Sequence, residues 1–227
     1  MTENSVVHFE DEQYNDRAVI CGKMKVKKLL CIVGAGGHGK VVADIAVKCG
    51  YTDIRFFDDN PDITNCGRYP VVGDSDRIKN MNGDVIIAIG NPVMRRKIQE
   101  RIEEERLVTL VHPDAVIAED AVVGKGTVVM AGTVINSGSV IGRGCIINTC
   151  ASVDHDCALG DFVHVAVGAH LTGGVKVGYG TWIGAGAVVN NDVSICEGCM
   201  IGTGAVVVRN IRVSGTYVGV PAKQIAE

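Results

Sequence analysis

The sequence predicts a Rossmann-like α/β half domain followed by a parallel β-helix. Between residues 29 and 111, short apolar runs alternate with helical patterns, which is typical of a parallel sheet joined by crossover helices. From Ile117 onward an aliphatic residue recurs at every sixth position, and a fixed short period indicates a solenoid. Composition agrees with narrow, repetitive packing, since the 227 residues include 29 glycines and only 4% aromatic residues.

The α/β domain is expected over residues 26–111, after a solvated tail at 1–25 that shows no hydrophobic period. Gly50 would close the first helix, and the Asn91-Pro92 pair would begin the second as N-cap and first residue. The expected elements are strand 29–33, turn 34–39, helix 40–49, strand 54–57, strand 84–89, a helix from residue 92 and strand 108–111. The buried stripe of the second helix would be Met94, Ile98 and Ile102.

The β-helix is expected over residues 112–227. Seventeen consecutive aliphatic residues, from Ile117 to Val213, are spaced six apart without an insertion. Six residues fit one short strand and a turn, so three units close a triangular coil and residues 18 apart stack at the ~4.8 Å strand spacing. Four residues after each aliphatic, a mostly small residue would fill the inner corner. Cysteines at this position are expected to pack in the core rather than react: Cys145, Cys157 and Cys199.

Composition also narrows the possible partners. The chain carries 22 Lys and Arg against 26 Asp and Glu, a net charge of −4, so no basic surface is expected to bind nucleic acid or an anionic membrane. No run of about 20 residues is continuously apolar, which argues against membrane insertion. The nine cysteines show no secretory framework and no apolar leader precedes them, so a cytoplasmic location is expected.

A glycine-rich turn follows the first strand and begins the first helix. Its pattern, Gly34-x-Gly36-x-x-Gly39, lets the backbone approach a phosphate at a helix N-terminus. About 20 residues further on, Asp58 and Asp59 end the next strand, where a carboxylate can accept hydrogen bonds from ribose hydroxyls. A dinucleotide domain needs two mononucleotide halves, whereas this domain has room for one. The pattern therefore predicts nucleotide binding and favours a nucleotide sugar over NAD.

His155 is the main candidate for acid–base chemistry. It lies two residues after the inward-facing Val153, so its side chain is expected to point outward, and Asp154 and Asp156 flank it. An exposed imidazole beside a carboxylate suits a general base near pH 7, because the carboxylate raises the basicity of the ring and fixes its tautomer. Since residues 18 apart stack, Gly173 is expected one coil above His155, where its N–H could meet a developing oxyanion.

The hexad pattern resembles the left-handed β-helix of the hexapeptide-repeat acyltransferases, from about residue 115 to the tail Gly219–Lys223. With the glycine turn, the Asp58-Asp59 pair and the Asn148…His155-Asp156…His164 spacing, the chain from about residue 27 resembles the nucleotide-sugar acetyltransferases of bacterial glycan synthesis. The nearest type is the UDP-4-amino-4,6-dideoxy-sugar N-acetyltransferase of bacillosamine pathways. The resemblance implies a left-handed coil, acetyl-CoA as co-substrate, direct transfer without a metal, and a homotrimer with active sites between subunits.

The resemblance also implies roles for individual residues. It makes His155 the general base, Asp156 the neighbour that orients it, and the Gly173 N–H the donor to the oxyanion. The family pattern has Glu at the position of Asp156, and Asp is one methylene shorter, so the sequence leaves open whether it reaches His155. The implied nucleotide-sugar contacts are Gly36, Gly37, His38, Asp58, Asp59, Gly90, Asn91 and Asn148. The implied acetyl-CoA contacts are His164, Gly173, Ala185 and Thr203.

Other functions stay open from the residues alone. A sugar O-acetyltransferase of the sialic-acid type would share this layout. A metal-dependent β-helix enzyme would need three histidines such as His155, His164 and His170, although His164 and His170 lie one face apart and cannot meet within one chain. A non-catalytic nucleotide-binding scaffold and an NAD enzyme are the remaining alternatives. The lone Cys196-x-x-Cys199 pair is a weak zinc signal, because Cys199 points inward.

Overall fold

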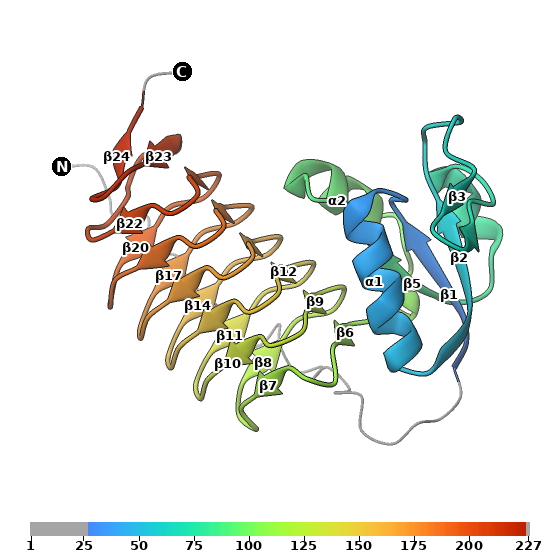
Figure 1. The fold of residues 1–227 in the computed structure, drawn as a ribbon, viewed down its shortest axis with the longest axis horizontal. Helices are drawn as coiled ribbons and strands as arrows, with labels where there is room; N and C mark the ends of the chain where they lie inside the picture. The colour runs from blue at the N-terminus through green and yellow to red at the C-terminus, as the bar shows by residue number, and fades with distance from the viewer. Residues whose placement is uncertain (1–26, 226–227) are drawn as a thin grey trace.

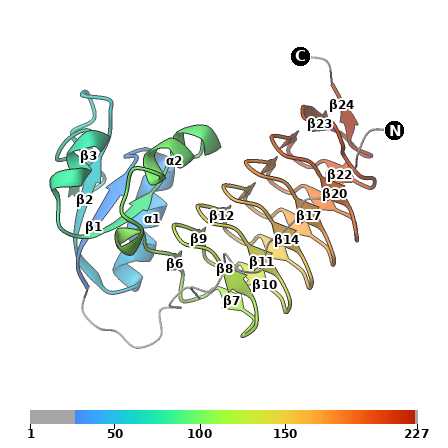
Figure 2. The ribbon, with the colours of Figure 1, turned by 180° about the vertical axis from the view of Figure 1, so that it is seen from behind.

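The computed structural model describes residues 27–225 and has two parts, an α/β part and a β-helix (Figure 1). The tail predicted at residues 1–25 lies outside the described residues. The β-helix extends away from the α/β part, and its last strands lie at the far end (Figures 1 and 2). The predicted fold class, an α/β half domain followed by a parallel β-helix, is therefore confirmed. No helix among the described residues is long and apolar enough to cross a membrane.

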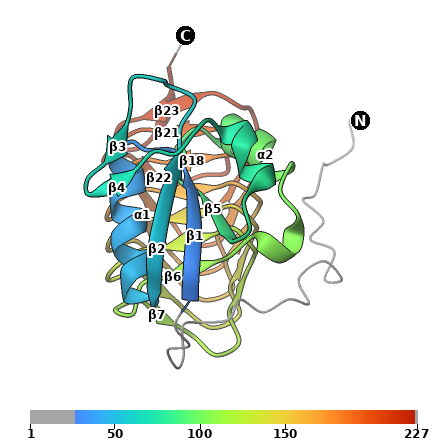
Figure 3. The same cartoon turned by 90° about the vertical axis from the view of Figure 1, so that its right-hand side faces the viewer.

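The α/β part is a small parallel sheet with strand order β2-β1-β5. One of its faces packs on helix α1, whose buried residues also contact the first coils of the β-helix through Val128 and Ile146. The helix therefore lies between the sheet and the β-helix, and Figure 3 shows the sheet in front of the coils. Its elements are β1 (Lys27–Val33), α1 (Gly37–Lys48), β2 (Tyr51–Phe57), β3 (Asn65–Cys66), β4 (Tyr69–Pro70), a 3₁₀ helix (Ser75–Asn80), β5 (Asp84–Ile87), α2 (Pro92–Gln99) and a second 3₁₀ helix (Glu104–Arg106).

The predicted end of helix α1 and the predicted start of helix α2 are confirmed, whereas the predicted start of α1 is not. Helix α1 begins at Gly37, three residues earlier than predicted, and Gly50 follows it with a positive φ of 90°. Helix α2 begins at Pro92, and the Asn91 side chain caps it by accepting a hydrogen bond from the Met94 N–H. The earlier start of α1 places the glycine turn in the first helical turn, where the free N–H groups point outward.

The predicted buried stripe of α2 is only partly correct. Ile98 is buried, and Ile102 is buried just beyond the end of the helix, but Met94 is 41% exposed. The residues buried instead are Arg95 and Gln99. The reason is that α2 packs against a corner of the β-helix, where main-chain carbonyls need hydrogen-bond donors that an apolar residue cannot supply.

The β-helix has three faces, each named here by its first strand. The β6 face contains β6, β9, β12, β15, β18, β21, β23 and the antiparallel β24; the β7 face contains β7, β10, β13, β16, β19 and β22; the β8 face contains β8, β11, β14, β17 and β20. The strands are β6 (Leu110–Val111), β7 (Val116–Ile117), β8 (Val122–Val123), β9 (Val128–Val129), β10 (Val134–Ile135), β11 (Val140–Ile141), β12 (Ile146–Ile147), β13 (Ser152–Val153), β14 (Ala158–Leu159), β15 (His164–Val165), β16 (His170–Leu171), β17 (Lys176–Val177), β18 (Trp182–Ile183), β19 (Val188–Val189), β20 (Ser194–Ile195), β21 (Met200–Ile201), β22 (Val206–Val207), β23 (Thr216–Val218) and β24 (Lys223–Gln224).

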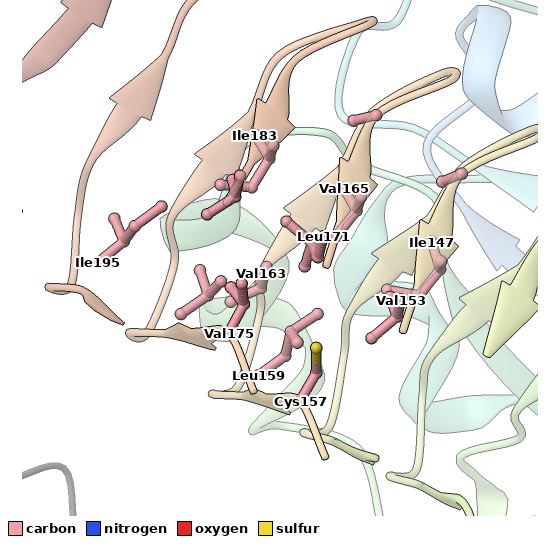
Figure 4. Close-up of a cluster of buried hydrophobic side chains, with 14 of the residues drawn as sticks. Ile147, Val153, Cys157, Leu159, Val163, Val165, Leu171, Val175, Ile183 and Ile195 are labelled. Carbon is pink, nitrogen blue, oxygen red and sulfur yellow. The ribbon is translucent and has the colours of Figure 1, made fainter. Parts of the chain in front are cut away.

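The register of the coils matches the predicted stacking of residues 18 apart, as in the pair His164 and Trp182. In the two-residue strands of the coils, the second residue points to the axis of the β-helix. These aliphatic side chains meet there and form the core (Figure 4). The small residues at the inner corner are buried as predicted. Burial raises the pKa of the Cys145 thiol to about 12 and that of Cys157 to about 11, so both are packed as neutral groups.

The repeat begins one unit earlier and ends one unit sooner than predicted. Strand β6 pairs with β9 and does not complete the α/β sheet. The segment before β6 instead forms an isolated bridge to that sheet between Leu107 and Val85. At the other end Val213 is 61% exposed, so its predicted inward position is wrong. The reason is a shorter last coil, in which Tyr217 pairs with Ile201 only 16 residues away.

Candidate active site

His155 lies at a corner of the β-helix, in the turn between β13 on the β7 face and β14 on the β8 face. Its Nδ1 is 2.8 Å from the Oδ2 of Asp156, so the shorter acidic side chain does reach the ring. Asp156 makes this contact from the left-handed region, with φ of 59°. Since a carboxylate only accepts, Nδ1 carries the proton and Nε2 is left to accept one.

The acidic neighbours of His155 strengthen it as a base. The hydrogen bond to Asp156 and the charge of Asp154 raise the pKa of His155. Asp154 is itself kept ionised, because hydrogen bonds from Asn136 and from the His155 N–H lower the pKa of that carboxyl. The ring is 59% exposed, so a substrate could reach Nε2 without displacing protein atoms.

Gly173 lies directly against the ring of His155, one coil further along. A Cβ built on Gly173 would be 2.6 Å from both Cε1 and Nε2 of His155. Any side chain at this position would therefore collide with the imidazole. The Gly173 N–H donates no hydrogen bond within residues 27–225. The predicted trio of His155, Asp156 and Gly173 is thus contiguous in the fold.

The glycine turn contains two glycines that the fold requires and two that face open space. Gly34 has a φ of 104°, and a Cβ on Gly39 would strike the Gly34 carbonyl oxygen, so the fold itself requires both. Gly36 and Gly37 are exposed, and nothing lies within 4 Å of a Cβ built on either. These two residues therefore leave open space at the N-terminus of α1, as a bound phosphate would need.

Of the two aspartates predicted beside the nucleotide, Asp58 bonds to the glycine turn and Asp59 bonds to the start of the 3₁₀ helix at Ser75. Asp58 accepts a hydrogen bond from the Ala35 N–H through Oδ2 at 2.8 Å. Asp59 accepts one from the Ser75 N–H through Oδ1 at 2.8 Å. Each carboxylate keeps lone pairs that are not used by these bonds. Asp58 therefore lies beside the open N-terminus of α1.

A second cluster lies where the α/β part meets the β6 face. Asn148 Nδ2 is 3.2 Å from the Nε2 of His164, and the ring of His164 stacks on Trp182 with centroids 4.2 Å apart. The Asn148 Oδ1 accepts from the Thr149 N–H, which fixes the orientation of the amide. Nε2 of His164 therefore accepts and its Nδ1 carries the proton.

His38 also belongs to this cluster, because its charge would act on His164, and both imidazoles are neutral. Burial, helped by the charge of Arg95, lowers the pKa of His38 to about 4 and that of His164 to about 3. Among the described residues, the buried Nε2 of His38 and Nδ1 of His164 have no hydrogen-bond partner. A buried imidazole nitrogen without a partner is costly, so the cluster has a place for a ligand group.

Comparison with known proteins identifies the family. Residues 29–102 match the family model described as the PglD N-terminal domain. The acetyltransferase domain of PglB from Neisseria gonorrhoeae is 40% identical with a TM-score of 0.82, and the match covers 87% of this chain and 99% of that one. The chain belongs to this family of β-helix nucleotide-sugar N-acetyltransferases.

Two further solved structures support the assignment. A perosamine N-acetyltransferase from Caulobacter crescentus, in a His-to-Asn variant bound to CoA and GDP-perosamine, is 37% identical, with 87% of this chain and 97% of that chain covered and a TM-score of 0.81. WeeI from Acinetobacter baumannii is 28% identical, with 87% and 100% covered and a TM-score of 0.78. The predicted enzyme class, an acyltransferase, is therefore confirmed.

The two clusters of this acetyltransferase lie on different sides of the prism. His155 is at the corner between the β7 and β8 faces, whereas His164 is on the β6 face. The third predicted group, Ala185 and Thr203, stacks at a different corner, where the Gly204 N–H donates to the Ala185 carbonyl at 2.8 Å. One chain of the acetyltransferase thus does not bring all predicted site residues together, as expected from the nine-residue spacing of the two histidines.

Sequence reasoning missed two residues of the second cluster. Arg95 is fully buried and donates four hydrogen bonds to main-chain carbonyls, two on each part of the molecule. Trp182 lies between His164 and Gly90. The signal for Trp182 was available, because it is the single tryptophan of the chain and lies 18 residues after His164. Arg95 had no such signal, since its exposed neighbour Arg96 carries the same charge.

His170 and the cavity at the far end of the β-helix belong to neither cluster. The described residues contain no group of three His, Cys, Asp or Glu that could hold a metal ion, and His170 instead contacts Ser152. A cavity of about 710 Å³ lies at the far end of the β-helix, beside Met200 and Thr216. No titratable side chain lines it, so we assign the chemistry to the clusters above and not to this cavity.

Proposed function

We propose that this acetyltransferase transfers the acetyl group of acetyl-CoA to the amine of a UDP-linked 4-amino-4,6-dideoxy sugar. Related structures were solved with acetyl coenzyme A and with CoA and GDP-perosamine. The observation that carries the proposal is the His155–Asp156 pair against Gly173, because it joins an oriented base to a free N–H donor. Residues 26–111 would bind the nucleotide sugar and residues 112–227 would perform the transfer.

The proposed reaction uses His155 as the general base. Its Nε2 accepts the proton of the amine while the nitrogen attacks the thioester carbon, and Asp156 stabilises the resulting imidazolium. The Gly173 N–H donates to the oxyanion of the tetrahedral intermediate. When the carbon–sulfur bond breaks, the CoA thiolate takes the proton back from His155. The products are the acetamido sugar and CoA thiol, and no covalent enzyme intermediate or metal takes part.

The nucleotide sugar is proposed to bind in front of α1. The diphosphate would lie at Gly36 and Gly37, the uridine at Asp58 and Asp59, and the sugar toward His38. Gly90, Asn91 and Asn148 would line the same space, and the acetyl-CoA would pass His164, Ala185 and Thr203.

A homotrimer is proposed because the two clusters lie on different sides of one prism. His155 of a neighbouring subunit would then complete the site formed by His38 and His164. A cytoplasmic location, where acetyl-CoA is available, fits this reaction. Size determination in solution and a mixed trimer of His155→Ala and His38→Ala chains would test the shared site, because such trimers regain some intact sites only if each site uses two chains.

The nucleotide and the acceptor atom are tested together. Release of free CoA thiol is measured with UDP- and GDP-linked amino sugars and with the corresponding hydroxyl acceptors. Turnover of the UDP-linked amine supports the proposal, preference for the GDP-linked amine corrects the nucleotide, and preference for a hydroxyl acceptor indicates an O-acetyltransferase. His155→Ala is expected to lower kcat by about 10²–10⁴, the usual range for a general base, while CoA binding remains.

A further inference from the structure

Trp182 lies at the edge of the part of the β6 face that the α/β part buries. The outward-facing residues of this face stack in one column, and the first three, Leu110, Val128 and Ile146, are at most 1% exposed beneath the α/β part. His164 is 7% exposed, Trp182 is half-buried, and Met200 is 43% exposed. The indole ring therefore lies at the edge of the covered region and stays partly accessible to solvent.

The ring of Trp182 is turned toward the α/β part. A Cβ built on Gly90 would be 3.7 Å from Cζ3 and 3.9 Å from Cη2, so the six-membered ring faces the loop before α2. The ring also packs against His164, with centroids 4.2 Å apart and the two planes tilted by 48°. Arg95 holds the loop in place by donating to the Gly90 carbonyl at 2.7 Å. Trp182 thus lies between Gly90, proposed above to line the nucleotide-sugar site, and His164, proposed above to contact acetyl-CoA.

The polar groups beside Trp182 are uncharged. The partnerless nitrogens of His38 and His164 belong to neutral rings, and Arg95, the one buried cation among the described residues, donates to four carbonyl oxygens. An aromatic face next to neutral hydrogen-bonding groups suits a sugar ring, whose C–H face packs on the indole while its polar substituents meet the imidazoles. The diphosphate would be better placed at the open N-terminus of α1.

We infer that Trp182 is the aromatic wall on which the acceptor sugar packs, and that it sets the affinity for the nucleotide sugar rather than for acetyl-CoA. The inference rests on the proposed function, since it names a further contact of the same acceptor site. The acyl donor is expected to run along the Ala185 and Thr203 corner, away from the Gly90 loop that the indole faces.

Tryptophan emission tests the inference directly, because the chain has a single tryptophan. The full-length protein is titrated separately with the UDP-linked amino sugar, with UDP and with CoA, and CoA thiol release is measured in the same preparation. The nucleotide sugar is expected to change the emission saturably, UDP to change it much less, and CoA not to change it. A response to CoA alone would place the ring at the acyl donor and overturn the inference.

The outcomes separate the two proposals. If the preparation turns over the nucleotide sugar while its emission is unaffected, the role of Trp182 is wrong and the proposed function stands. If no nucleotide sugar is turned over or changes the emission, both are wrong. If the nucleotide sugar changes the emission but only a hydroxyl acceptor is acetylated, the role of Trp182 is supported and the proposed amine acceptor is wrong.

Kinetic variants provide a second measurement. Trp182→Ala is expected to raise the KM for the nucleotide sugar about 10-fold, in line with the loss of one aromatic stacking contact, and to leave the KM for acetyl-CoA unchanged. Trp182→Phe keeps a ring and should remain within about 3-fold of the native KM. Met200→Ala, one coil further along the same column, is the matched control and should change neither KM. An equal rise in both KM values for Trp182→Ala would contradict the inference.

Discussion

Arg95 offers the most direct test of how the two parts of this acetyltransferase are joined. Its guanidinium is fully buried, and no carboxylate within residues 27–225 pairs with it. It donates to Ile89 and Gly90 at 2.8 and 2.7 Å on the α/β part, and to Gly144 and Phe162 at 2.7 and 2.6 Å on the β-helix. Replacing it by Met keeps most of the volume and removes every donor.

The expected effect follows from the carbonyls left behind. A buried acceptor that loses its donor costs about 1–3 kcal/mol, so the two β-helix carbonyls alone account for roughly 2–6 kcal/mol. Part of this is offset because a buried charge no longer has to be desolvated, the same effect that lowers the pKa of Arg95 to about 10. We expect a net loss of about 2–4 kcal/mol for Arg95→Met. At about 2–4 °C per kcal/mol for a chain of this size, the melting temperature falls by roughly 5–15 °C.

Thermal unfolding with two probes measures this effect. Circular dichroism follows the coils, and Trp182 emission follows the junction between the parts. In Arg95→Met the emission is expected to change below the main transition, and the KM for the nucleotide sugar should rise while that for acetyl-CoA does not. Arg101→Met is the matched control, since Arg101 is exposed and pairs with Asp76 within the α/β part. Native melting and native kinetics for Arg95→Met would refute the assigned role.

Three further predictions concern the His155 cluster and the glycine turn. Asp156→Asn removes the main cause of the raised pKa of His155, so the acidic limb of the pH–kcat profile, where the base becomes protonated, should move to lower pH. Gly173→Ala should lower kcat at least 10-fold at an unchanged melting temperature, because its Cβ would lie 2.6 Å from the ring of His155 and displace it. Gly39→Ala should destabilise the fold by colliding with a main-chain carbonyl, whereas Gly37→Ala, which has open space, should mainly raise the KM for the nucleotide sugar.

Controls and contrary outcomes are available for each. Asp161→Asn changes another surface carboxylate, paired with Arg143, and should leave the pH profile in place. For Gly173→Ala the control is Asn191→Ala, since Asn191 lies one coil beyond Gly173 in the same column. This variant should not alter kcat. An unmoved acidic limb in Asp156→Asn, or equal melting temperatures for the two glycine variants at positions 37 and 39, would contradict the respective assignment.

The sequence alone determined the features that depend on local repetition. The six-residue period predicted the coils, because each unit packs against the same neighbours and register follows from counting. Counting also brought Gly173 to His155, and the helix-start pattern placed Asn91 at the cap of α2. These results needed no knowledge of how the two parts meet.

Only the tertiary structure decided what the two parts do to each other. Arg95 reaches Phe162 across 67 residues of sequence, and His164 becomes a neutral, buried ring because the α/β part covers it. Neither effect has a periodic signal, since burial and desolvation depend on surfaces brought together by the whole fold. The same reason explains why the sequence predicted Met94 to be buried in α2: it could not show that the facing surface presents carbonyl oxygens, which require the donors of Arg95.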